Sequence, residues 1–125
     1  MMKYASIILF LFILISCATQ KPTGGATDYW AIAPDLTKVT YEGGNGKSID
    51  SAIVIKNAEN TRNGIASEYV FIAKIHGEKF KDWKPIGHAT NTVNGRPIDM
   101  IKILLISKDE TLSYYFDITD FYRKL

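Results

Sequence analysis

Two histidines are the side chains in this sequence most suited to binding a metal or moving a proton near neutral pH. Catalytic zinc is commonly held by histidines and a carboxylate, and Glu68, Glu78 and Asp82 are near His76 and His88 in the sequence. A small metal-dependent hydrolase using both histidines is therefore one hypothesis. The structural alternative places His76 at a helix C-terminus, where the helix dipole favours it, and His88 half-exposed on a strand. We favour that alternative, so the sequence predicts no metal site and no cofactor.

Other motifs that could carry chemistry are incomplete. A phosphate-binding loop needs a glycine five positions before Gly46, and Tyr41 stands there instead, so residues 44–48 are interpreted as a turn and no nucleotide is expected. Glu68 lies beside an apolar stripe that can shift its pKa, but acid–base catalysis needs a second positioned group. Neither His-Glu-x-x-His nor Gly-x-Ser-x-Gly occurs in the sequence. We therefore predict no catalytic residue and expect the chain not to be an enzyme.

The single cysteine, Cys17, stands where an N-terminal apolar run ends. Residues 5–15 are apolar except for Ser6, and Lys3 precedes them. A helix of that length spans about 16 Å at about 1.5 Å per residue, which is short of the ~30 Å hydrocarbon layer of a bilayer. The run is typical of a cleaved export signal rather than of a membrane span.

The residues Leu14-Ile15-Ser16-Cys17 resemble the lipobox of bacterial lipoproteins. The resemblance implies that lipid is attached to the Cys17 sulfur, that cleavage falls between Ser16 and Cys17, and that the new amine is acylated. Ala18 follows, which by the enterobacterial sorting rule implies the outer membrane. Two or three acyl chains would hold a protein durably on a bilayer. An ordinary secretory signal with an incidental cysteine is the alternative.

The chain divides into three parts on composition. Residues 1–16 are expected to be the signal peptide, residues 17–27 the lipidated cysteine with a flexible tether, and residues 28–125 a single folded domain. The tether has no aliphatic side chain larger than alanine after Cys17, so it cannot bury enough apolar surface to offset its ordering entropy.

Charge excludes some partners. The chain carries 15 Lys+Arg and 13 Asp+Glu, a net charge of +2. That balance is too even for a protein that gains affinity by neutralising phosphates, so no nucleic acid is expected as a partner. One cysteine also cannot form an internal disulfide or a multi-cysteine zinc site.

The elements that must position these residues follow from periodicity. A helix is predicted over 64–76, because Ile65, Tyr69, Ile72 and His76 recur at helical spacing and Gly77 follows as a cap. Strands are predicted over 35–42, 52–56, 85–93, 98–107 and 111–118, with an Asn94–Gly95 hairpin turn between the third and fourth. The fold class is therefore α+β: one helix packed on an antiparallel sheet that ends in a three-stranded meander.

The mature domain, over roughly residues 41–122, resembles small exported bacterial proteins. The likeness rests on the spacing from Asn45-Gly46 through residues 52–55 and Glu68-Tyr69 to residues 115–118. It implies an exported α+β domain and no particular activity.

Aromatic residues are the remaining candidates for contact with a partner. Aromatic side chains with one edge exposed to solvent are enriched at protein interfaces. The candidate interaction surface therefore consists of Trp30, Trp83 and Tyr115. The alternative is that the two tryptophans close the ends of a small core.

Three functional hypotheses remain open at this point. The leading one is a non-enzymatic binding or accessory module of the cell envelope, of the partner-binding, inhibitor or immunity type, anchored in the membrane by lipid. Its expected partner is another envelope or extracellular protein. The alternatives are the small hydrolase or metal-dependent enzyme built on His76 and His88, and a glycan-binding lipoprotein.

Overall fold

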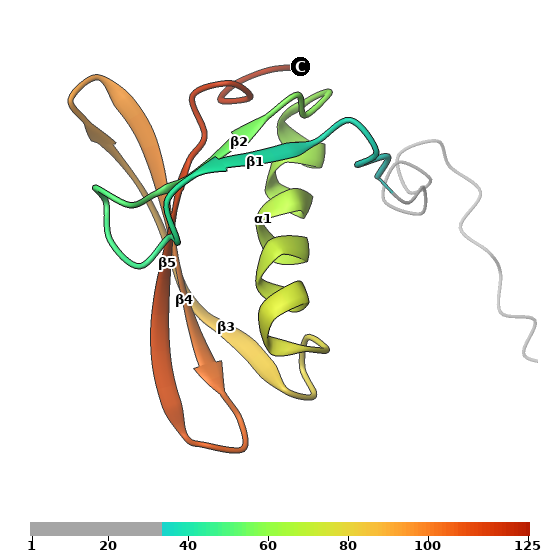
Figure 1. The fold of residues 1–125 in the computed structure, drawn as a ribbon, viewed down its shortest axis with the longest axis vertical. Helices are drawn as coiled ribbons and strands as arrows, with labels where there is room; N and C mark the ends of the chain where they lie inside the picture. The colour runs from blue at the N-terminus through green and yellow to red at the C-terminus, as the bar shows by residue number, and fades with distance from the viewer. Residues whose placement is uncertain (1–33) are drawn as a thin grey trace, which may run out of the picture. The chain divides into compact units, whose positions relative to one another are not determined.

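The computed structural model describes residues 34–125, which belong to one compact unit. The predicted signal peptide, Cys17, the tether and Trp30 lie outside these residues. One helix lies against a five-stranded sheet (Figure 1). In chain order the elements are β1 (Thr40–Gly43), β2 (Ile53–Lys56), α1 (Thr61–His76), β3 (Trp83–Val93), β4 (Arg96–Leu105) and β5 (Glu110–Asp117). Within residues 34–125, no helix has the length and apolar character needed to cross a membrane.

The sheet is mixed, with strand order β1-β2-β5-β4-β3. The five strands form two antiparallel groups, β1 with β2, and β3 with β4 and β5. The groups join where β2 runs parallel to β5, with Ile53 opposite Phe116. The α+β class is therefore right, but the prediction of a wholly antiparallel sheet is wrong. In the sequence, α1, β3 and β4 come between β2 and β5. The parallel pair is therefore not joined by a hairpin turn.

The three-stranded meander is present as β3, β4 and β5. Its first turn is Asn94–Gly95, with φ of 51° and 74°, which are the left-handed values that a type I′ hairpin turn requires. The second turn contains Asp109 at φ 50°. The Asn94–Gly95 turn falls at the predicted position, because its signal is local.

Helix α1 starts three residues before the predicted start. Asn60 is the N-cap, and its side chain accepts a hydrogen bond from the backbone N–H of Asn63. The C-terminal end is as predicted: Gly77 has φ of 102° and donates its N–H to the Ala73 carbonyl.

The buried face of α1 differs in part from the predicted stripe. Ile72 is fully buried as expected, but Ile65 is 40% exposed, and Gly64 and Ser67 face inward instead. The reason is the ring of Phe121: a Cβ built on Gly64 would meet it at 2.3 Å. Because the ring occupies this space, the helix presents its smallest side chains here.

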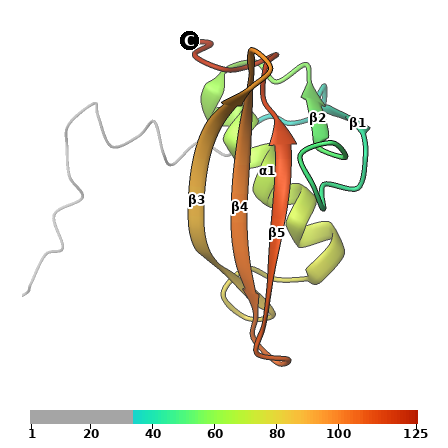
Figure 2. The same ribbon diagram turned by 90° about the vertical axis from the view of Figure 1, so that its left-hand side faces the viewer.

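The core lies between α1 and the sheet. Its largest apolar members are Trp83, Tyr114, Phe116, Phe121 and Ile101, all at most 1% exposed. Figure 2 looks onto the opposite face of β3, β4 and β5, which α1 does not cover.

Candidate functional site

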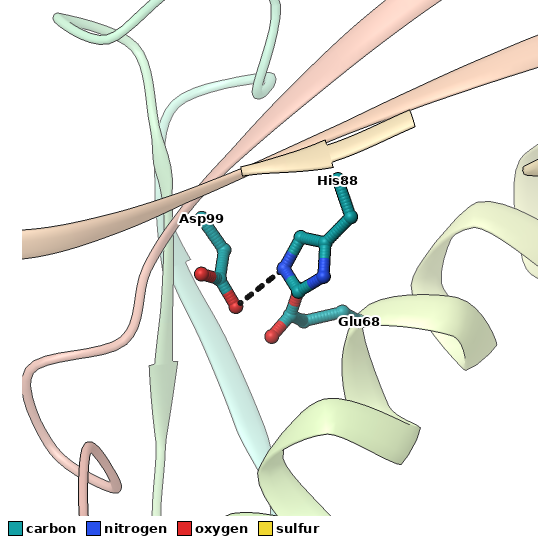
Figure 3. A group of neighbouring side chains, drawn as sticks. All are labelled: Glu68, His88 and Asp99. Atoms are coloured by element: carbon teal, nitrogen blue, oxygen red, sulfur yellow. Dashed lines mark ion pairs between the residues drawn. The ribbon is translucent and has the colours of Figure 1, made fainter. Parts of the chain in front are cut away.

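Three titratable side chains from three elements converge beneath the sheet. Glu68 comes from α1, His88 from β3 and Asp99 from β4 (Figure 3). One donor atom from each lies within 4.8 Å of the other two. His88 Nε2 is 3.4 Å from Asp99 Oδ2. We call these three residues the EHD cluster.

Strand register explains how the cluster is assembled. Thr90 is the residue of β3 opposite Asp99, and His88 is opposite Ile101. Because side chains two residues apart on a strand share a face, His88 and Thr90 point to the same side of the sheet as Asp99 and the core residue Ile101. Thr90 Oγ1 donates a short hydrogen bond to Asp99 Oδ1, which fixes the orientation of that carboxylate.

Glu68 is the most unusual member of the EHD cluster. It is 0% exposed, and neither of its carboxylate oxygens has a hydrogen-bond partner in the structure. Buried polar groups are nearly always hydrogen-bonded, so an unsatisfied carboxyl group needs an explanation. Burial raises the pKa of Glu68 to about 10, and the neighbouring Asp99 carboxyl adds to the rise. The expectation of a shifted Glu68 pKa is therefore confirmed, and the group carries a proton at neutral pH.

Exposure differs across the EHD cluster. Asp99 is 2% exposed, whereas the side chain of His88 is 43% exposed. The imidazole therefore stands between the buried carboxyl groups and water. Two carboxyl groups and an imidazole are suited to bind a divalent cation or to hold and pass a proton.

His76 is part of a different group. Its Nε2 is 2.6 Å from the Tyr114 hydroxyl, which also accepts a hydrogen bond of 3.1 Å from Lys47 Nζ. Partial burial lowers the pKa of His76, and the charges of Lys47 and Lys108 lower it further. His76 is the last residue of α1, at the helix C-terminus as expected, but the lowered pKa favours its neutral form and so weakens its interaction with the helix dipole.

Two of the three carboxylates considered as metal ligands with the histidines, Glu78 and Asp82, are not part of the EHD cluster. Glu78 forms an exposed ion pair of 3.8 Å with Lys81, and Asp82 Oδ2 accepts the backbone N–H of Glu78. Within residues 34–125, Glu68, His88 and Asp99 are the one group of three or more metal-ligating side chains. The structure thus brings together Glu68 and His88 but not His76, and it adds Asp99.

Asp99 was not predicted as a site residue. The signal was present in the sequence, since Asp99 stands between Ile98 and Met100 in a strand whose residues 97–105 are otherwise apolar apart from Lys102. An acid at an inward position of a central strand is rarely buried without a partner.

The 44–48 segment is a turn, as expected. Gly46 has φ of 78° and its carbonyl accepts the backbone N–H of Tyr115, which ties the turn to β5. Lys47 contacts Tyr114, and the Lys47 N–H is bonded to the side chain of Asn45.

The aromatic candidates have different positions. Trp83 is 0% exposed, and its Nε1 donates to the Gly77 carbonyl, so its assignment to an interaction surface is wrong and the core alternative holds. Tyr115 is half-buried on the uncovered face, since its neighbours Tyr114 and Phe116 both point into the core. Trp30 lies outside the described residues.

No protein-family model matches the sequence, and neither a curated protein nor a solved structure shows significant similarity to it.

Proposed function

We propose that this chain is a lipid-anchored protein of the bacterial cell envelope, located at the outer membrane, and that its domain is a non-enzymatic module that binds another envelope or extracellular protein. Inhibitor and immunity proteins are of this type. The anchor rests on the lipobox at residues 14–17. The binding role rests on the face of the sheet opposite α1, which no helix or strand of residues 34–125 covers.

The uncovered face offers a partner an apolar centre. Alternation along β4 and β5 gives this face side chains that point away from the core residues, among them Met100, Lys102, Leu104, Ser113 and Tyr115. We call these five residues the outer face. Met100 and Tyr115 are directly opposite each other in the ladder, and both are half-buried. A half-buried methionine–tyrosine pair on an open sheet is typical of the centre of an interface.

The charges around the outer face are positive. Lys102 is exposed within it, and Lys84 is opposite Leu104 on the neighbouring strand. The carboxylate on this side of β5, Asp117, is neutralised by Arg96 at 2.8 Å. A partner with acidic side chains around an apolar patch is therefore complementary to this surface.

The separation of the histidines weighs against the two-histidine enzyme. His76 is bonded to Tyr114, while His88 belongs to the EHD cluster. A hydrolase built on both residues would need them to share one substrate or one metal.

Site-specific photocross-linking in cells tests the binding role. A photoreactive phenylalanine analogue at position 115 is expected to give one discrete adduct with an envelope protein. Because rim charges are screened by salt, the adduct should weaken as ionic strength rises. Lys102→Glu should abolish it.

Lys74→Glu is the matched control, because it makes the same charge change on α1, which covers the other face of the sheet. The adduct should survive in this variant. An adduct that persists equally in Lys102→Glu, or no adduct at position 115, would overturn the proposal.

A further inference from the structure

We propose that Glu68, His88 and Asp99 form a binding site for a divalent transition-metal ion, with zinc as the preferred ion. The inference does not depend on the proposed binding of a protein partner. It goes against the sequence-based expectation of no metal site, which considered the two histidines together and did not include Asp99.

The donor geometry is close to that of a bound ion. Zinc is held by histidine nitrogen and carboxylate oxygen at about 2.0–2.2 Å, so two ligands of a tetrahedral site are separated by about 3.4 Å. His88 Nε2 and Asp99 Oδ2 are 3.4 Å apart. The third donor, from Glu68, lies within 4.8 Å of both, so a small rotation of its side chain would complete the set.

The unsatisfied carboxyl group of Glu68 gives an independent reason to expect a ligand. The residue is 0% exposed and its two oxygens have no hydrogen-bond partner, yet the side chain is directed at Asp99 and His88 (Figure 3). A cation between the three residues would displace the proton of Glu68 into solvent, coordinate the resulting carboxylate and balance the charge of both acids. Without a metal ion, the protonated Glu68 side chain has no hydrogen-bond partner, and Asp99 has His88 as its ion-pair partner at 3.4 Å.

The surroundings provide orientation and access. Thr90 fixes Asp99 through its hydroxyl, as residues behind a metal ligand commonly do. His88 is 43% exposed and lies on β3, an edge strand, so an ion can enter from the solvent side of the imidazole.

The donor set selects the class of ion. Imidazole suits zinc, copper, iron and nickel, whereas magnesium and calcium require six or more oxygen ligands. Three protein ligands of mixed type leave at least one coordination position for water, as in catalytic zinc sites. We therefore expect zinc to bind well and calcium and magnesium to bind weakly.

Metal titration of the full lipidated chain in detergent tests the site. After treatment with EDTA and its removal, the wild-type protein is expected to bind one zinc per chain by elemental analysis and to gain thermal stability with zinc. His88→Gln and Glu68→Gln should each weaken zinc binding by at least about tenfold. An excess of magnesium should not displace the zinc.

His76→Gln is the matched control, because it removes the other histidine, which the structure places outside the EHD cluster. It should bind zinc as the wild type does. His88 is half-exposed, so its variant is expected to fold, and a circular dichroism spectrum checks this. Less than one zinc per wild-type chain, or equal binding by His88→Gln and wild type, would overturn the proposal. So would the loss of zinc in His76→Gln.

Discussion

The buried carboxyl group of Glu68 predicts an unusual dependence of stability on pH. In the folded protein its pKa is about 10, against an ordinary value of 4.5. The native state therefore holds a proton that the unfolded chain releases above pH 4.5. This contribution to stability is complete below the unfolded pKa and is lost as pH rises toward the folded pKa.

The magnitude follows from the size of the shift. One pKa unit corresponds to about 1.4 kcal/mol, so the free energy of unfolding should fall by about 2 kcal/mol between about pH 7.5 and about pH 9. For a domain of this size that loss corresponds to a fall in Tm on the order of 10 °C. Histidine ordinarily titrates near pH 6.5, so this window also excludes most of the histidine contribution.

Urea unfolding in EDTA, across this pH range, measures the effect without a bound metal. Glu68→Gln keeps the size of the side chain but removes the ionisable group, so the fall should be absent in this variant. Glu78→Gln is the control, because its side chain is 72% exposed, and its fall should match the wild type. A wild-type slope that Glu68→Gln leaves unchanged would refute the reasoning.

Three further predictions concern the core and the anchor. Gly64→Ala should destabilise the domain by about 1–3 kcal/mol in urea unfolding, although alanine favours helices, because its Cβ would overlap the Phe121 ring at 2.3 Å; equal or greater stability would contradict this packing. Trp83→Phe should cost about 2 kcal/mol, since it removes the hydrogen bond to the Gly77 carbonyl and leaves a void; a loss below about 0.5 kcal/mol would be inconsistent with full burial. Cys17→Ser should abolish labelling by a radioactive fatty acid and leave the precursor uncleaved, and a labelled variant would rule out this cysteine as the anchor.

The parts of the fold with local signals could be predicted from the sequence. The Asn94–Gly95 turn requires positive φ at both residues, and Gly77 ends the helix for a similar reason. The parallel pairing of β2 with β5 could not be predicted, because it joins Ile53 to Phe116 and depends on the path of the chain between them.

The same distinction applies to the site. Glu68 was recognisable as an acid beside an apolar stripe, and His88 as a strand residue. Their partnership with Asp99 depends on the β3–β4 register and on which side of α1 faces the sheet. The inward position of Gly64, which the Phe121 ring requires, moves the buried face toward Ser67 and Glu68 and away from Ile65.

The proposed metal site is tested most directly by X-ray absorption spectroscopy of the zinc-loaded protein. We predict one imidazole nitrogen and carboxylate oxygens at about 2.0–2.2 Å from the ion. A spectrum that requires two imidazoles would place the zinc on both histidines, and a spectrum of hydrated zinc alone would show that the EHD cluster binds no metal; either result would contradict the assignment.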